Sequence, residues 1–162
     1  MPLTPFHWSV VLVGLVFFDV FYIPALAISS VIMDVEPAYY LFISPSIDGT
    51  LHGFFHTYFG ASLIALAVGF VLVRFRSKMD LIMRFFRIEQ NISSVKIYLS
   101  SFLAAYSHIF LDSFMHADMK PFWPFVGNPF LGLVDVSMIY LISGLAFIPI
   151  IVLYIWRLLT KN

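Results

Sequence analysis

Four long apolar stretches, separated by shorter polar segments, dominate the chain. They cover about residues 8–33, 51–73, 95–117 and 134–156. A bilayer core about 30 Å thick takes roughly 20 apolar residues of helix, so each stretch is long enough to enter a membrane. The pattern predicts an all-α integral membrane protein in which residues 1–162 form a single membrane-embedded helical bundle.

Composition strengthens this prediction and narrows the chemistry. Hydrophobic residues make up 61% of the 162 residues and charged residues only 11%. This length leaves no room for a separate soluble domain, and we expect no nucleic-acid partner. The chain contains no cysteine, which excludes disulfides and thiolate metal sites.

The first apolar stretch does not resemble one uninterrupted span. Asp19 lies near its middle, and Pro24 follows shortly after, where the residue before a proline is pushed away from helical geometry. Two half-helices, about 8–18 and 24–33, would each be roughly 16 Å long. We therefore expect three full spans plus an N-terminal broken or re-entrant helical hairpin, with four full spans as the alternative.

The choice between hairpin and span decides where the N-terminus lies. In a hairpin, His7 lies on the same side of the membrane as Asp34, whereas in a single span it lies alone on the opposite side. The tip of a hairpin would have to pack inside the bundle, because non-helical backbone is tolerated in a membrane only where protein or water covers it.

The distribution of basic residues predicts the orientation. Six of the nine lysines and arginines fall between Arg74 and Lys96. Basic residues near span ends mark the cytoplasmic side. We expect a multi-pass protein of the cell membrane in which the 74–96 connection, with a basic amphipathic segment at 78–90, and the C-terminus are cytoplasmic. The 34–50 and 117–133 connections would then lie outside.

Histidine and carboxylate residues gather at three places near the predicted outer ends of the spans. An ionisable side chain in a membrane segment costs roughly 2.5–3.5 kcal/mol, so these residues are functional candidates. The clusters are Asp34 with Glu36, His52 with His56, and His108 with Asp112 and His116. The i,i+4 spacing of His52/His56 and of His108/Asp112 predicts that each pair shares one helix face. Each pair alone is equally typical of hydrogen bonding or packing, but together they favour a metal site.

Imidazole and carboxylate ligands without thiolates suit zinc, manganese or iron, and zinc is our first choice for the divalent metal. The ligands exceed one tetrahedral site, so one or two ions could bind. Our candidate ligands are His7, Asp34, His56, His108 and Asp112. We expect His52, His116 and Asp118 to be further ligands or to orient the ligands by hydrogen bonds. Lys120 is the only basic residue in the predicted outer connections, which makes it a candidate to bind an anionic substrate group.

Several motifs resemble those of a known family. They are Pro5-Phe6-His7, Asp34-Val35-Glu36-Pro37, Phe55-His56-Thr57, and Ala105 to Asp112 with the later Pro124. Their kinds and order resemble the LexA-regulated membrane-bound metal-dependent hydrolases, which are distantly similar to zinc-dependent phospholipase C. The resemblance implies ligand positions at His7, Asp34, Glu36, His56, His108 and Asp112. Pro37 stands where that family often has histidine, and His52 matches less closely than His56.

The resemblance implies a metal-dependent hydrolase, and the similarity to phospholipase C implies a phosphoester substrate. We therefore expect hydrolysis of a membrane lipid or lipid-linked phosphoester near the outer face, with Glu36 as general base. Three other classes fit the same residues. They are a non-catalytic accessory subunit, a metal or proton transporter, and a haem-binding electron-transfer subunit with histidine axial ligands.

Overall fold

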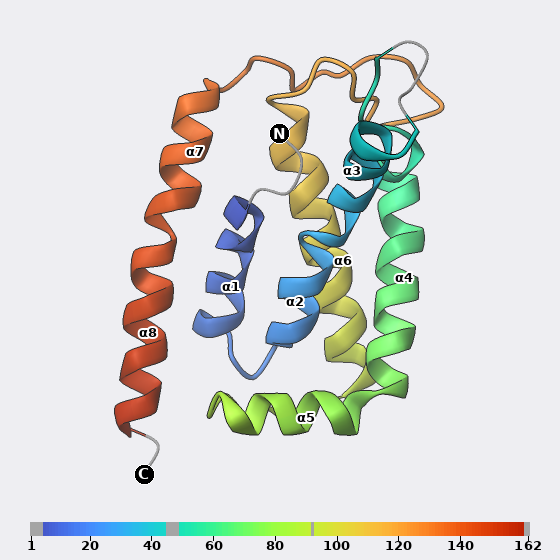
Figure 1. Ribbon diagram of the computed structural model, residues 1–162. Helices are drawn as coiled ribbons and strands as arrows, with labels where there is room; N and C mark the ends of the chain where they lie inside the picture. The colour runs from blue at the N-terminus through green and yellow to red at the C-terminus, as the bar shows by residue number, and fades with distance from the viewer. Residues whose placement is uncertain (1–4, 45–48, 92, 161–162) are drawn as a thin grey trace.

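A computed structural model describes residues 5–44, 49–91 and 93–160, so both ends of the predicted domain 1–162 and part of the 34–50 connection lie outside the described residues. Within these ranges the only regular elements are helices, with short 3₁₀ helices labelled η, which confirms the all-α fold (Figure 1). The helices are η1 (Pro5–Val10), α1 (Val11–Val16), α2 (Ile23–Ser29), η2 (Ile32–Asp34), α3 (Val35–Phe42), η3 (Phe54–His56), α4 (Tyr58–Arg74), α5 (Arg76–Phe85), α6 (Ser94–Ser113), α7 (Val136–Leu145) and α8 (Phe147–Thr160).

The N-terminal stretch forms a hairpin rather than a single span. η1 and α1 run toward the end of the bundle where α5 lies, and α2, η2 and α3 return toward the opposite end (Figure 1). Pro24 stands in the first turn of α2, where its missing N–H costs no hydrogen bond. The second arm is longer than the predicted half-helix 24–33, because Ile23–Phe42 continues for 20 residues.

The structure supports fewer spans than the sequence predicts. Among the described residues, Ile23–Phe42 and Val136–Thr160 are long and apolar enough to cross a membrane. A third span is added only if α4 and α5, which meet at an angle of 80°, are counted as one. Helix α6 has 20 residues but is not apolar enough to count as a membrane span. Its serines and its buried histidine and aspartate lower its mean hydropathy. Such polar groups belong in the interior of a bundle.

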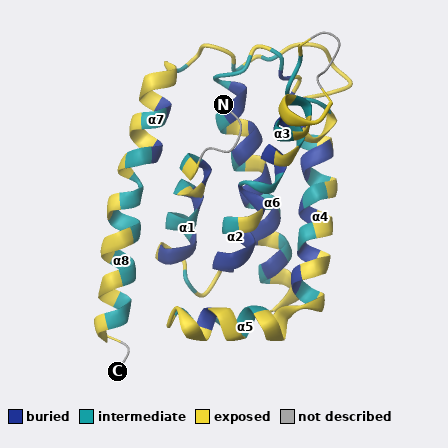
Figure 2. Cartoon of the chain, in the orientation of Figure 1, coloured by how far each residue is buried: buried dark blue, intermediate teal, exposed yellow. Residues whose placement is uncertain are grey.

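Helix α6 is indeed the central helix. Its buried face packs against α4 largely through small side chains, since Ala61 and Ala65 of α4 share one buried cluster with Ala105 of α6. Small residues allow helix backbones to approach closely in membranes. Buried residues concentrate on α2 and α6, whereas α8 has none, so α8 lies at the periphery (Figure 2).

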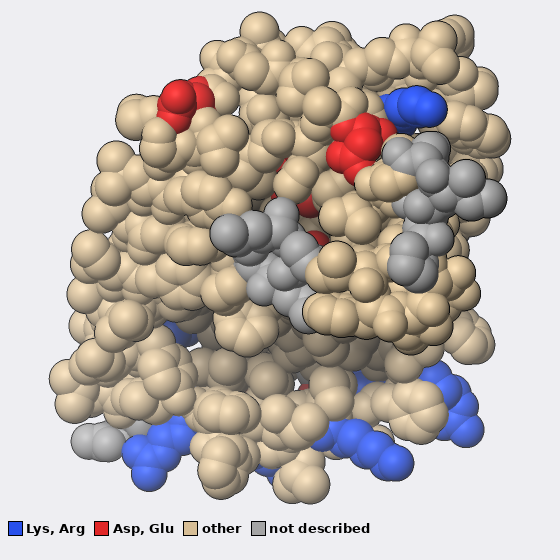
Figure 3. Space-filling model, turned by 45° about the horizontal axis from the view of Figure 1, so that its top comes forward, with Lys and Arg blue, Asp and Glu red and all other residues tan. Residues whose placement is uncertain are grey.

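The end of the bundle opposite the candidate site is closed by α5 and by the segment after it. Helix α5 lies across the bundle, as predicted for an amphipathic connection, and basic side chains gather at this end (Figure 3). Gln90 holds the tip of the N-terminal hairpin. Its Nε2 donates to the carbonyls of Phe18 and Phe21 at 2.7 and 2.6 Å, and its Oε1 accepts from Ile23 N at 2.9 Å.

The prediction that His52 and His56 share one helix face is wrong. Residues 49–53 are not helical, His56 ends η3, and α4 begins only at Tyr58. His116, predicted to lie on the third span, follows the end of α6 at Ser113 and lies outside any helix.

Candidate metal centre

Four residues from three segments meet in the interior near one end of α6. His7 comes from η1, Asp34 from η2, and His108 and Asp112 from α6. Each offers a ligand atom within 4.8 Å of the others, and all four are buried. Asp112 joins the two imidazoles, because its Oδ1 lies 3.2 Å from His7 Nε2 and its Oδ2 lies 3.3 Å from His108 Nε2. His108 and Asp112 therefore share a helix face, as their spacing predicts.

His56 approaches the same place from η3. Its Nε2 lies 3.3 Å from Nε2 of His108, and both side chains are fully buried. The Nδ1 of His108 lies 2.7 Å from the carbonyl oxygen of Ser30, and the Nδ1 of His56 lies 2.8 Å from Glu36 Oε2. A carbonyl or carboxylate oxygen can only accept, so each Nδ1 carries the proton in the neutral ring. With both rings neutral, the two Nε2 lone pairs face each other, an arrangement that a bound metal ion or a proton on one Nε2 would satisfy.

Two further atoms in the cluster have no hydrogen-bond partner among the described residues. They are Nδ1 of His7 and Oδ2 of Asp34, and both are buried. Buried polar groups are almost always paired, so an unpaired imidazole nitrogen and carboxylate oxygen beside facing lone pairs need an explanation. A divalent cation with nitrogen and oxygen ligands fits this donor set.

A second group of ligand atoms adjoins the first. His52, His56 and Asp112 also offer atoms within 4.8 Å of one another, so Asp112 belongs to both groups. A shared carboxylate between adjacent groups can bridge two metal ions, and paired ions in hydrolytic sites lie about 3.5–4 Å apart. The arrangement can hold one ion or two.

A third group lies nearer the surface and consists of His52, His116 and Asp118. The rings of His52 and His116 lie 4.1 Å apart between centroids, and His52 Nδ1 donates to Asp118 at 2.9 Å. Burial and the neighbouring His52 lower the pKa of His116 to about 4, and burial also lowers the pKa of His52. Both imidazoles are therefore neutral at pH 7, the form that binds metal ions.

Asp118 fixes the segment that carries His52. Burial raises the pKa of Asp118, but hydrogen bonds from the backbone N–H groups of Leu51 and His52 outweigh it, and the pKa is about 2. The carboxylate is therefore ionised at neutral pH. Its contacts with His52 are hydrogen bonds between a neutral ring and a carboxylate.

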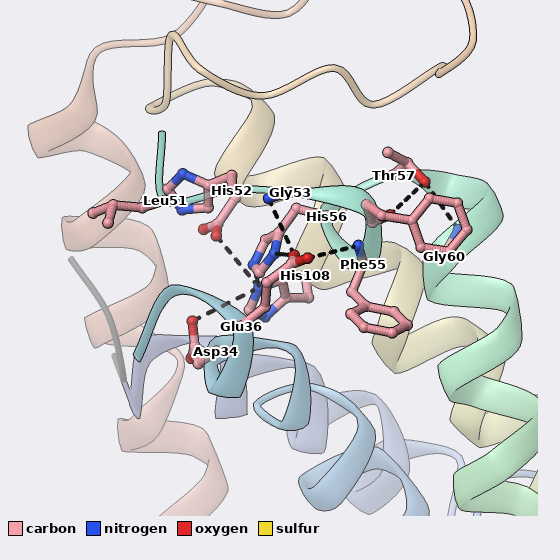
Figure 4. A network of polar contacts seen from close by, with 12 residues as sticks. Asp34, Glu36, Leu51, His52, Gly53, Phe55, His56, Thr57, Gly60 and His108 are labelled. Atoms are coloured by element: carbon pink, nitrogen blue, oxygen red, sulfur yellow. Dashed lines mark hydrogen bonds and ion pairs between the residues drawn. The ribbon is translucent and has the colours of Figure 1, made fainter. Parts of the chain in front are cut away.

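Glu36 plays a comparable part for His56 (Figure 4). Its Oε2 accepts from His56 Nδ1 and from Gly53 N, and its Oε1 accepts from Phe55 N, the last two at 3.2 Å. The carboxylate lies on the Nδ1 side of the ring, away from the Nε2 that faces His108. This geometry is that of a group that orients a ligand, and the role of Glu36 as general base stays a prediction.

Lys120 lines an open pocket beside the cluster. The pocket has a volume of about 360 Å³, and its lining includes His52, Gly53 and Asp118. A cation at this place could contact an anionic group that approaches His52 from the surface.

A known protein family matches most of the chain. The model of the YdjM inner membrane protein family matches residues 12–161. The chain belongs to this family. No curated protein and no solved structure matches the chain.

Membership of the YdjM family establishes a membrane protein, in agreement with the apolar helices, and it fits the predicted membrane-bound family of the LexA-regulated type. The family match shows neither a hydrolase activity nor a link to zinc. Of the residues predicted for the site, the structure brings His7, Asp34, His56, His108 and Asp112 into one cluster. His52 adjoins it, His116 and Asp118 form its outer extension, and Lys120 lies at its edge.

Sequence reasoning missed two supporting groups. The Ser30 carbonyl that accepts from His108 carries no signal in the sequence, since every residue has a carbonyl. Gly53 does carry one, because it stands between the two histidines of the His52/His56 pair. A Cβ at this position would lie 2.6 Å from Glu36 Oε1, so only glycine lets Glu36 reach the turn.

Proposed function

We propose that the protein is a metal-dependent membrane hydrolase that cleaves a lipid or lipid-linked phosphoester. The metal would be a divalent ion, with zinc preferred, and one or two ions would bind the cluster described above. The observation that carries this proposal is the pair of buried Nε2 atoms of His56 and His108, 3.3 Å apart with both Nδ1 atoms engaged elsewhere.

A metal ion in such a site supplies Lewis acidity toward phosphoryl oxygens and activates water at neutral pH. The protein residues have distinct tasks. His56 and His108 would hold the ion, with Asp34, Asp112 and His7 as further ligands. Glu36 and the Ser30 carbonyl keep the two imidazoles in the tautomer that presents Nε2.

The substrate class rests on two features of the surroundings. Lys120 offers a positive charge beside His52, which suits the phosphoryl group of a phosphoester. The cluster lies among apolar helices near one end of the bundle, a position that suits a substrate held in the bilayer (Figure 1). By the excess of basic residues at the α5 end, we place the cluster toward the outside.

The test combines metal analysis with activity. We would purify the unmodified protein and the His108→Ala and Asp112→Asn variants in detergent and measure bound metal by elemental analysis. Hydrolysis of p-nitrophenyl methyl phosphate would be followed in the same samples. We expect bound metal and activity in the unmodified protein and loss of both in the two variants.

Asp19→Asn serves as the matched control, because Asp19 is an exposed aspartate at the hairpin tip, at the other end of the bundle. It should retain metal and activity. An unmodified protein that contains no metal would overturn the proposal. Bound metal without hydrolysis of any phosphoester would favour a non-catalytic accessory subunit.

A further inference from the structure

A second pocket lies on the opposite side of Glu36 from the metal cluster. It has a volume of about 430 Å³, within the range of about 300–1,000 Å³ typical of small-molecule sites. Apolar side chains of η2, α3 and α4 form its walls, including Ile32, Val35 and Ile64. Phe55, from the turn that precedes His56, closes one side.

Among the described residues that line this pocket, Glu36 is the only charged one. The Glu36 carboxylate accepts hydrogen bonds from the N–H groups of Gly53 and Phe55 and from His56 Nδ1. These bonds orient it toward the segment that carries His56. The lining of the pocket is therefore mainly apolar. Glu36 lies between the pocket and His56, a candidate metal ligand.

The position of the pocket limits what can enter it. Ile32, Val35 and Tyr39 belong to Ile23–Phe42, one of the two helical segments that are apolar and long enough to cross a membrane. Val35 is 57% exposed and Tyr39 46%, so the pocket opens sideways from the bundle. If Ile23–Phe42 crosses the membrane, the mouth of the pocket faces hydrocarbon, and an aliphatic chain is the ligand that can enter without losing hydration.

The turn formed by residues 53–55 separates this pocket from the one that contains Lys120. Gly53 and Phe54 line the polar pocket, and Phe55 lines the apolar one. The two pockets therefore flank the same turn, with His56 at its end. One offers a cation and the other offers hydrocarbon, which are the two surfaces that an amphiphilic phosphoester needs.

We infer that the α3/α4 pocket binds the aliphatic chain of the substrate and selects long-chain phosphoesters over short ones. This inference rests on the proposed function and adds the specificity determinant. Val35 is the residue best suited to a test, because it is exposed, lines the pocket and makes none of the hydrogen bonds of the cluster.

The first measurement compares two substrates with the same leaving group, p-nitrophenyl hexadecyl phosphate and p-nitrophenyl methyl phosphate. Val35→Trp fills the pocket. It should lower kcat/KM for the hexadecyl ester about tenfold or more, while kcat/KM for the methyl ester stays unchanged. Leu63→Trp is the control, because Leu63 is 44% exposed on α4 and does not line the pocket. Equal effects of Val35→Trp on the two esters, or no effect, would overturn the inference.

The second measurement needs no catalysis, so it separates a failure of this inference from a failure of the proposed function. Hexadecyl phosphate with a photoreactive diazirine in its chain would be cross-linked to the purified protein and the labelled peptides identified by mass spectrometry. We expect saturable labelling of residues 32–40 and 55–64 that hexadecyl phosphate competes away and that Val35→Trp reduces. Helix α8 has no buried residue and reports background contact with lipid. Labelling no stronger on the pocket segments than on α8 would exclude a chain-binding pocket, whether or not either ester is hydrolysed.

Discussion

The Oε2 atom of Glu36 lies 2.8 Å from Nδ1 of His56. This contact fixes the proton of the imidazole on Nδ1 and leaves Nε2 free toward His108. A metal-ligating histidine usually donates its other ring N–H to such a partner, and a carboxylate in this position orients the ring and raises its basicity. The pair links α3, which belongs to the apolar segment Ile23–Phe42, to η3, which precedes α4.

Glu36→Gln should weaken metal binding. A glutamine keeps the shape of the side chain, but an NH₂ donor replaces one of the two carboxylate oxygens that accept from Gly53, Phe55 and His56. Loss of an orienting partner typically costs about 10–100-fold in metal affinity or activity. Metal titration of the apoprotein with zinc, using a competing chelator, measures the change.

The same variant also tests the role of Glu36 predicted from the sequence. A general base contributes about 10²–10⁴-fold to the rate without holding the metal. Normal zinc affinity combined with activity lowered by about two orders of magnitude would therefore assign Glu36 as the base. Asp19→Asn, which removes an exposed carboxylate far from the cluster, again serves as the control.

Gly53→Ala should damage the centre although glycine contributes no ligand. The added Cβ would lie 2.6 Å from Glu36 Oε1 and 3.3 Å from the hydroxyl of Tyr40, so the carboxylate that holds His56 must shift. We expect zinc affinity to fall by about 10–100-fold, as for other losses of an orienting group. Gly144→Ala is the matched control, since its added Cβ meets only Phe6 at 3.6 Å, an ordinary contact. Unchanged zinc affinity in Gly53→Ala would mean that the Glu36–His56 contact does not support the site.

His108→Ala and His116→Ala should differ in severity. His108 is fully buried and contacts His56 and Asp112, whereas His116 is partly buried and lies beyond the end of α6. We expect His108→Ala to abolish metal binding and His116→Ala to reduce affinity by no more than about 10–100-fold. Elemental analysis of the two purified variants measures the difference. Full metal occupancy in His108→Ala would contradict the assignment of the centre.

Helical spacing predicted the part of the site that lies within one helix. His108 and Asp112 are one turn apart on α6, and the structure places their side chains 3.3 Å from each other. The amphipathic pattern after residue 74 likewise predicted a separate helix, which the structure has as α5. In both cases the determining interactions are local, so the sequence pattern contains them.

The segment that carries His52 and His56 could not be predicted in this way. Its backbone N–H groups are satisfied by partners distant in the sequence, since Asp118 accepts from Leu51 and His52, and Glu36 accepts from Gly53 and Phe55. With these partners the segment has no need of helical hydrogen bonds. The apolar pattern alone favoured a helix from residue 51, and only tertiary contacts overrule it.

Gln90 should stabilise the tip of the N-terminal hairpin. Gln90→Ala removes the partner of two carbonyls and one N–H in the 18–23 segment. Leaving buried groups unsatisfied costs roughly 1–3 kcal/mol each, so we expect a lower Tm in detergent by circular dichroism. Asn91→Ala, at an exposed neighbouring position, should leave Tm unchanged. A Gln90→Ala variant as stable as the unmodified protein would show that water replaces these hydrogen bonds at no cost.

Cysteine labelling should place the candidate site on the outer side of the membrane. The chain has no cysteine, so single substitutions report their own accessibility. Val126, in the connection between α6 and α7, is 86% exposed, and Ser77 is exposed on α5 among the basic residues. Because basic residues favour the cytoplasmic side, an impermeant maleimide should label Val126→Cys in intact spheroplasts and Ser77→Cys only after permeabilisation. The reverse labelling pattern would mean that the bundle has the opposite orientation in the membrane. The metal centre and Lys120 would then lie on the cytoplasmic side.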